Sequence, residues 1–148
     1  MAKRSLGVDV LTAARQRIAR VFDDFPKIYL SFSGGKDSAV MLHLVAEEAR
    51  RRNRRFGLMF LDIEAQDAMT IDHVAEMYDL YADCTEPFWF AVPIHLRNAV
   101  SQFESQWICW EPGRENDWVR APHPRSITDA SGLPYYKYAM EFEEFVPG

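Results

Sequence analysis

The sequence predicts an α/β fold, in which an open parallel sheet carries helices on both faces. Three short segments are apolar throughout, which indicates strands buried on both sides, because a half-exposed strand alternates polar and apolar residues. Helical patterns separate these segments, and such an alternation of strand and helix is typical of a parallel sheet. The first of the strands stops at a glycine pair, where the chain must turn.

The predicted elements follow one another over the first two thirds of the chain. Apolar residues recur at three- and four-residue steps between Leu11 and Phe25, which predicts a helix. Asp9 is its expected N-cap, and Pro26 ends it. Strands are predicted at residues 27–32, 56–61 and 88–94, and two further helices at about residues 38–52 and 68–81.

Beyond residue 94 the alternation ends. Residues 98–138 contain Trp107, Trp110 and Trp118, several prolines and no clear period. We expect a single domain, in which residues 1–97 form a nucleotide-binding α/β core and residues 98–148 an irregular, aromatic-rich extension. A doubly wound sheet usually has about five strands and only three are evident, so either the extension supplies short strands or the chain is part of a longer protein.

The composition is that of an ordinary globular domain. The 148 residues are 48% hydrophobic and 26% charged, which argues against a disordered chain. No apolar run approaches the ~18 residues of a membrane span and no signal-peptide pattern is present, so we expect a cytoplasmic protein without a membrane partner. Cys84 and Cys109 are too few and too far apart for a disulfide framework or an all-cysteine zinc site.

Charge is divided unevenly along the chain. Residues 1–60 carry 12 Lys/Arg against 6 Asp/Glu, whereas residues 61–148 carry 5 against 16, which leaves a net charge of −5. The basic front half suits an anionic ligand, and the acidic back half argues against direct nucleic-acid binding. The arginine run at residues 50–55 is interpreted as a solvated helix end, with a patch for nucleic acid or an acidic partner as the alternative.

The strongest candidate for a functional motif is Ser-Phe-Ser-Gly-Gly-Lys-Asp-Ser at residues 31–38, between the first predicted strand and the next helix. Gly34 and Gly35 let the backbone turn tightly and present N–H groups to an anion, and the helix N-terminus adds its own N–H groups and dipole. Lys36 adds a positive charge, and Ser33 and Ser38 add hydroxyl donors. The motif predicts a phosphate- or pyrophosphate-binding loop; the alternative is an ordinary capped turn.

Asp37 is the unexpected member of this motif, because a carboxylate repels phosphates. It fits if it caps the helix or holds a magnesium ion shared with the phosphates. The motif is not a Walker A loop, because Leu30 stands where that loop has its first glycine and Asp37 where it has Ser or Thr.

Residues 33–38 resemble the pyrophosphate loop (PP-loop) of the adenine nucleotide α-hydrolase superfamily, which includes ATP pyrophosphatases and phosphoadenosine phosphosulfate (PAPS) reductases. The following residues 40–44, Val-Met-Leu-His-Leu, look like the sulfate-assimilation branch. Further strings are similar to phage- and prophage-associated PAPS-reductase-like proteins, some of which are described as transcriptional co-activators. These strings lie at residues 9–15, 101–104, 107–110 and 143–147.

The resemblance implies a Rossmann-like sheet with ATP or a related adenylyl compound at its carboxyl edge. It places around the phosphates Ser33, Gly34, Gly35, Lys36, Asp37 and Ser38, and beside the adenine Ser31, Phe32 and backbone groups of Leu61 and Asp62. Lys36 and Asp37 would be the catalytic residues, with Asp37 on Mg²⁺. Asp62 and Glu64 end the second strand where they could touch ribose or a metal, with a solvated turn as the alternative.

Two classes of function stay open. An enzyme would act at the α-phosphate, as a PP-loop ATP pyrophosphatase or adenylyltransferase, or would be PAPS-reductase-like. The sequence lacks the Glu-Cys-Gly motif of thiol-dependent PAPS reductases, and neither Cys84 nor Cys109 is expected to be catalytic. The alternative is a non-catalytic regulatory or transcriptional co-activator module that acts through a protein or DNA partner. For either class, the exposed edge of the sheet makes a homodimer a reasonable expectation.

Overall fold

The computed structural model describes residues 7–98 and 101–145. The first part of the chain forms α1 (Val10–Asp24), β1 (Tyr29–Ser31), α2 (Lys36–Arg51), β2 (Phe56–Leu61), α3 (Ala68–Leu80) and β3 (Thr85–Phe90). The second part forms β4 (Ile94–Arg97), β5 (Gln106–Cys109), the 3-10 helix η1 (Glu115–Asp117), β6 (Met140–Glu141) and the four-residue helix α4 (Phe142–Phe145).

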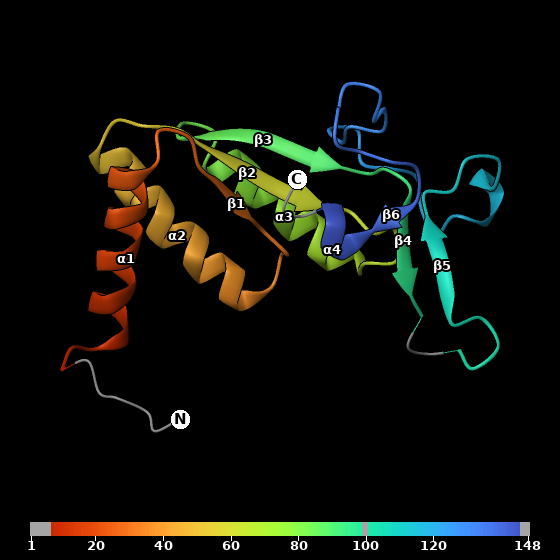
Figure 1. The fold of residues 1–148 in the computed structure, drawn as a ribbon, viewed down its shortest axis with the longest axis horizontal. Helices are drawn as coiled ribbons and strands as arrows, with labels where there is room; N and C mark the ends of the chain where they lie inside the picture. The colour runs from red at the N-terminus through yellow and green to blue at the C-terminus, as the bar shows by residue number, and fades with distance from the viewer. Residues whose placement is uncertain (1–6, 99–100, 146–148) are drawn as a thin grey trace.

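The main sheet has the order β1-β2-β3, and both of its pairings are parallel (Figure 1). The central strand β2 is buried along its whole length, which explains why Phe56–Leu61 shows no polar alternation. The outer strand β3 contains Pro87, which has no N–H to donate and is tolerated at a sheet edge. The predicted α/β class is confirmed.

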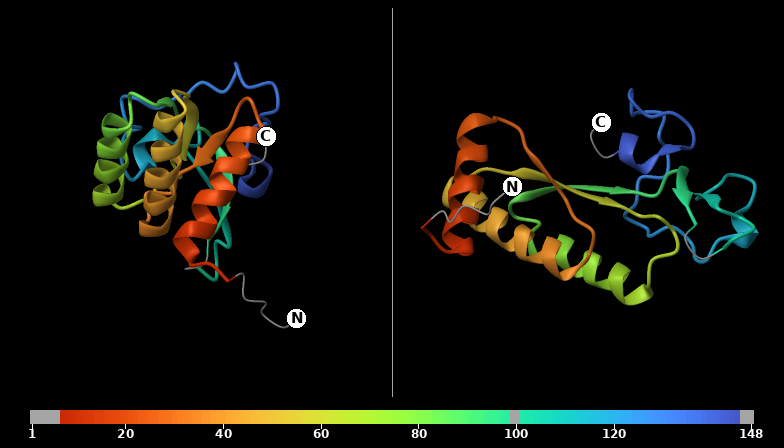
Figure 2. Two further views of the ribbon diagram at one scale, coloured as in Figure 1. Left: turned by 90° about the vertical axis from the view of Figure 1, so that its left-hand side faces the viewer. Right: turned by 60° about the horizontal axis from the view of Figure 1, so that its bottom comes forward.

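The two faces of the sheet are covered differently. On one face Phe56, Leu58 and Phe60 pack in a single core cluster with residues of α1, α2 and α3. On the other face Met59 and Leu61 belong to a second cluster, formed with the C-terminal segment and α4. Figure 2 shows α2 and α3 on one side of the sheet and the short α4 on the other. Helices thus lie on both faces, as predicted, with the three long ones on the same face.

The arginine run at residues 50–55 makes hydrogen bonds and ion pairs within the fold. Arg54 donates to the carbonyl oxygens of Phe22, Phe25 and Pro26, at distances of 2.5, 2.9 and 2.7 Å, and so satisfies the end of α1. Arg50, Arg52 and Arg55 pair with carboxylates or carbonyls of neighbouring segments, and Arg51 pairs with Glu48 of its own helix. The run is therefore a helix end held by internal contacts rather than a free basic patch.

Two predicted boundaries were wrong. The strand expected at residues 88–94 is two strands, because β3 already begins at Thr85 and residues 91–93 interrupt it before β4. Pro93 has no N–H to continue a ladder of hydrogen bonds, so the strand is interrupted before β4. Pro87 is untypical of a strand, and for this reason the start of β3 at Thr85 was not predicted. The second helix begins at Lys36 rather than near Ser38, since Gly35 is its N-cap.

The C-terminal segment supplies short strands, one of the two alternatives left open by the sequence. They do not extend the main sheet but form a second one of order β5-β4-β6 (Figure 1). In it β4 and β5 are antiparallel, and β4 and β6 parallel. A single bridge between Phe90 and Ile127 joins the segment to the end of β3. No helix among the described residues is long and apolar enough to cross a membrane.

Candidate functional site

The glycine-rich loop lies where β1 ends and α2 begins, at the carboxyl edge of the main sheet. Gly34 has a φ of +76°, in the left-handed region that favours glycine. A Cβ atom there would lie only 2.8 Å from Thr70 Cγ2 of α3. Gly35, the N-cap of α2, has no side chain to cap the helix. The first-turn N–H groups of α2 are thus left to an outside acceptor.

Two hydroxyl groups hold the loop in shape. The Oγ atoms of Ser33 and Ser38 lie 3.0 Å apart, and Ser38 Oγ donates to the Gly35 carbonyl oxygen at 2.9 Å. The Ser33 N–H points to Ser38 Oγ at 3.4 Å. These contacts fix the shape of the loop from Ser33 to Ser38, and its role around phosphates stays a prediction.

Lys36 and Asp37 extend from the start of α2 into solvent. Their side chains are 87% and 89% exposed, and Lys36 Nζ lies 2.7 Å from Asp37 Oδ1. Asp37 does not cap the helix, which corrects that part of the prediction: it is the second residue of α2, whose N-cap is Gly35. An acidic residue in the first turn still interacts favourably with the helix dipole.

Phe32 and Leu61 enter the two core clusters rather than a ligand site. The Phe32 ring is 1% exposed, and its N–H donates to the Met59 carbonyl oxygen at 2.7 Å. Leu61 is 7% exposed at the end of β2. Neither of these side chains is open to a ligand, so a contact of Phe32 or Leu61 with adenine would involve backbone atoms. Ser31 is exposed, and the adenine role predicted for all three residues stays a prediction.

Asp62 is fully buried and bound by other residues. Its carboxylate accepts two bonds from Arg120, the shorter at 2.6 Å, and one from Trp89 Nε1 at 3.1 Å. Its N–H donates to the Phe90 carbonyl oxygen, and its own carbonyl oxygen accepts from Trp110 Nε1. Asp62 thus anchors the C-terminal segment at the carboxyl edge, and its contact with adenine remains a prediction.

Glu64 is a second buried anchor at this edge. It is 4% exposed with a φ of +68°, and its carboxylate accepts the backbone N–H groups of Trp110 at 2.7 Å and Val119 at 3.1 Å. The solvated turn proposed as the alternative for Asp62 and Glu64 is therefore wrong. Both side chains tie the sheet to the segment that follows β5.

Two residues at this edge were not predicted from the sequence. Arg120 lies over the Trp110 ring at 5.2 Å, and its Nε atom is buried with no hydrogen-bond partner. His123 stacks on Trp89 with ring centroids 4.3 Å apart, and burial lowers its pKa below the ordinary 6.5, with nearby Arg125 adding to this effect. The one signal in the sequence was that arginines and tryptophans occur together after residue 106.

Neither cysteine is suited to be a nucleophile. Cys109 is completely buried, and burial raises the pKa of its thiol to about 12. Burial also raises the pKa of Cys84. Because the thiolate is the reactive form, both thiols are expected to be inert at neutral pH, as the sequence predicted.

The fold is therefore an α/β architecture with a glycine-rich loop at the carboxyl edge of its parallel sheet. Residues 27–106, more than half of the chain, match the family model of the phosphoadenosine phosphosulfate reductase domain. The chain belongs to this family. The matched region runs from just before β1 to the first residue of β5 and so includes the loop.

A relative in Escherichia coli (strain K12), described as uncharacterized protein YbdN, is 43% identical over 145 residues. The alignment covers 97% of this chain but 35% of that protein, so the chain spans about a third of the relative's length. No solved structure matches the chain. The resemblance to phage-associated members stays a prediction, and residues 146 and 147 of one string behind it lie outside the described residues.

Proposed function

We propose that this chain binds an adenine nucleotide, ATP or PAPS, through the loop of residues 33–38. The observation that carries the proposal is the shape of the loop: Gly34 turns the backbone against α3, and α2 begins directly after Gly35. A phosphate here would meet the N–H groups of the first helical turn, which have no partner inside a helix. Family membership supports the same class of ligand.

Lys36 and Asp37 have different roles in this proposal. The exposed Lys36 ammonium would bring a full positive charge to the phosphates. Asp37 would hold Mg²⁺, which is often bound by one or two carboxylates together with the phosphates of a substrate. The exposed Asp37 carboxylate fits this mode, and among the described residues no group of three acidic, His or Cys side chains could hold a metal alone. The ion, when bound, would offset phosphate charge.

The reaction we propose for this site is adenylyl transfer, or cleavage between the α- and β-phosphates. An oxygen nucleophile, of an acceptor substrate in adenylyl transfer or of water in cleavage, forms a bond to the α-phosphorus and gives up its proton to solvent. The bond from the α-phosphorus to the bridging oxygen breaks, and the leaving pyrophosphate takes the electron pair. Lys36 is the residue suited to stabilise that charge. A reductase step through a thiol of this chain is not supported, because burial raises the pKa of both cysteines. Family membership does not favour the regulatory or co-activator alternative.

Calorimetric titration with ATP, AMP and PAPS, each with and without Mg²⁺, tests the proposal. ATP or PAPS should bind more tightly than AMP, which lacks the outer phosphates. Lys36→Ala should weaken this binding by about tenfold or more, since a hydrogen bond to a charged group contributes ~1.5–3 kcal/mol. Magnesium dependence would point to ATP and Asp37, and tight PAPS binding without metal to a sulfonucleotide.

The matched control is Lys27→Ala. Lys27 is also exposed but lies before β1, at the opposite, amino end of that strand. The substitution removes the same charge and should leave the affinity unchanged. Equal losses in the two variants, or no binding of any of the three nucleotides, would refute the proposal. A cytoplasmic location and a homodimer or protein partner stay predictions from the sequence.

A further inference from the structure

The side chain of Gln66 bonds to the backbone at the end of β2. Its Oε1 atom accepts from the Ile63 N–H at 2.9 Å, and its Nε2 atom donates to the Leu61 carbonyl oxygen at 3.4 Å. One carboxamide therefore occupies a backbone donor and a backbone acceptor that lie side by side. Because the second contact is longer than an ordinary hydrogen bond and Gln66 is only half-buried, the side chain can leave both groups at small cost.

The Leu61 carbonyl oxygen lies on the same side of β2 as the start of the glycine-rich loop. The Phe32 N–H donates to the Met59 carbonyl oxygen at 2.7 Å, across the gap between β1 and β2. Met59 and Leu61 are alternate residues of β2, so their carbonyl oxygens point to the same side of the strand. Since β1 ends at Ser31, the Leu61 carbonyl oxygen is directed past the end of that strand.

Helix α3 connects Gln66 to the loop. Gln66 stands two positions before the first residue of α3. In the first turn of α3, Thr70 Cγ2 would be 2.8 Å from a Cβ atom at Gly34, and the Thr70 N–H donates to the Asp67 carbonyl oxygen at 3.0 Å. The loop and Gln66 thus flank the same helical turn, at the carboxyl edge of the sheet where α/β folds bind ligands.

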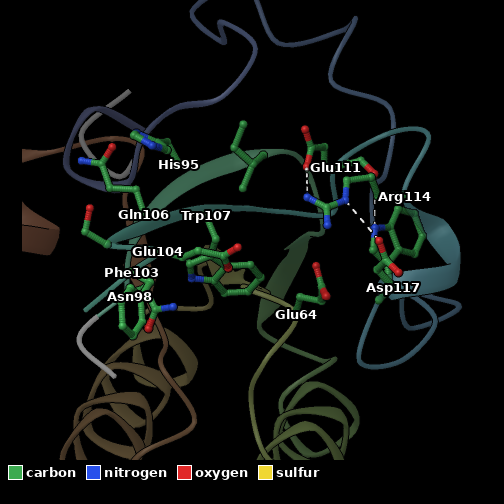
Figure 3. Close-up of a pocket in the computed structure, with 13 residues that line it drawn as sticks. Glu64, His95, Asn98, Phe103, Glu104, Gln106, Trp107, Glu111, Arg114 and Asp117 are labelled. Atoms are coloured by element: carbon green, nitrogen blue, oxygen red, sulfur yellow. Dashed lines mark hydrogen bonds and ion pairs between the residues drawn. The ribbon is translucent and has the colours of Figure 1, made fainter. Parts of the chain in front are cut away.

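Two buried carboxylates hold the turn after β2 independently of Gln66. They belong to Asp62 and Glu64, which bond to the C-terminal segment. Figure 3 shows Glu64 in a cleft of about 710 Å³ beside β5, and Gln66 does not line this cleft. The backbone of residues 61–63 should therefore keep its shape when the Gln66 carboxamide leaves it.

The backbone pair that Gln66 occupies is complementary to adenine. A carboxamide carries an N–H donor and an oxygen acceptor on one carbon, and the Watson–Crick edge of adenine likewise has its N6–H donor beside the N1 acceptor. Adenine can thus make the same two bonds to Leu61 and Ile63. Hypoxanthine has an O6 acceptor beside an N1–H donor, which would set acceptor against acceptor and donor against donor.

We infer that Gln66 is a placeholder for the base: adenine replaces its carboxamide on Leu61 and Ile63 when a nucleotide binds at the loop. This inference rests on the proposed function. Gln66 lowers the affinity for the nucleotide, because side chain and base compete for the same backbone groups. It also adds selectivity, since a base that cannot make both bonds does not replace the side chain.

Calorimetry with Gln66→Ala tests the inference. Whichever of ATP and PAPS the chain binds should bind the variant about three- to tenfold more tightly than wild type, because no side chain competes with adenine. Tripolyphosphate, which has no base, should bind both chains equally. The matched control Gln16→Ala removes an exposed glutamine from α1 and should change none of these affinities by more than about twofold.

NMR spectra of the wild-type chain test the same point without a substitution. The bound nucleotide should shift the side-chain amide signals of Gln66 and the backbone amide signal of Ile63. Inosine triphosphate, which carries hypoxanthine in place of adenine, should bind about tenfold more weakly than ATP or worse and leave the Gln66 signals in place.

Three results would overturn the inference and leave the proposed function standing. They are nucleotide binding by Gln66→Ala that is unchanged or weaker, an equal gain for tripolyphosphate, and a bound adenine nucleotide that leaves the Gln66 signals in place. If neither wild type nor Gln66→Ala bound ATP or PAPS, the inference and the proposed function would both be refuted.

Discussion

At Gly34 the loop and α3 come so close that a side chain would collide. With a φ of +76° and Thr70 Cγ2 and Val74 Cγ2 at 2.8 and 3.0 Å from a Cβ atom, Gly34→Ala combines strain with a clash. It should lower the free energy of unfolding by about 1–3 kcal/mol in urea denaturation. Gly132→Ala, where a Cβ atom meets nothing within 4 Å, should change it by less than about 0.5 kcal/mol. A Gly34 variant as stable as wild type would contradict this packing.

Single residues of the loop could be predicted because their chemistry is local. Ser33 and Ser38 are five positions apart, and a glycine pair between a strand and a helix leaves few conformations to choose from. The partner of Asp62 could not be predicted, because Arg120 follows 58 positions later in a segment without a period. No pattern in the sequence indicates which of the later arginines reaches the sheet.

At the scale of elements, Glu48 near the end of α2 pairs with Arg51 and Arg52. Arg52 pairs in turn with Asp23 of α1, so these ion pairs connect the two helices. A hydrogen bond from Arg51 at 2.7 Å, supported by Arg52, lowers the pKa of Glu48 from the ordinary 4.5 to about 2. A lowered pKa stabilises the fold above pH 4.5, and this contribution is lost as the pH falls toward 2. Glu48→Gln should therefore cost about 1–2 kcal/mol at pH 7 and little near pH 2.

Urea denaturation of wild type and Glu48→Gln between pH 2 and 7 measures this difference. Glu47→Gln is the matched control, because Glu47 is 59% exposed and its ion pair with Arg15 lies at the surface. Its effect should stay below about 0.5 kcal/mol at every pH. A difference for Glu48→Gln that does not depend on pH would show that its ionisation is not linked to folding.

Element types were predictable wherever the apolar period was strong. Helices α1 and α3 and strand β2 were predicted within two residues, since each buries a regular face or a whole segment. The start of β3 was predicted too late because its first half contains Glu86 and Pro87. An outer strand tolerates such residues, but they interrupt the run of apolar residues from which the strand was predicted. The two-residue strand β6 is held by its pairing with β4, which lies far away in the sequence.

At the scale of the molecule, the buried pair Asp62–Arg120 joins the C-terminal segment to the main sheet. Arg120→Ala would leave the Asp62 charge buried with Trp89 as its remaining side-chain donor. We expect a loss of about 2–4 kcal/mol in unfolding free energy. In hydrogen exchange, the Ile127 amide, which donates to the Trp89 carbonyl oxygen, should exchange faster than in wild type.

Arg114→Ala is the comparison for this prediction. Arg114 lies in the same segment, but its side chain is 63% exposed and its ion pairs lie at the surface. Its stability and the exchange of Ile127 should stay close to those of wild type. If the two variants behaved alike, the segment would not depend on the buried pair.

Binding of an adenine nucleotide at the loop is tested most directly by mapping ATP on the wild-type chain through backbone amide signals. Saturating ATP with Mg²⁺ should shift most strongly the amide signals of Gly34, Gly35, Lys36, Asp37 and Ser38. These amides lie at the start of α2, where the phosphates would be bound. Shifts that leave these five signals unchanged and appear instead around β4 and β5 would contradict it.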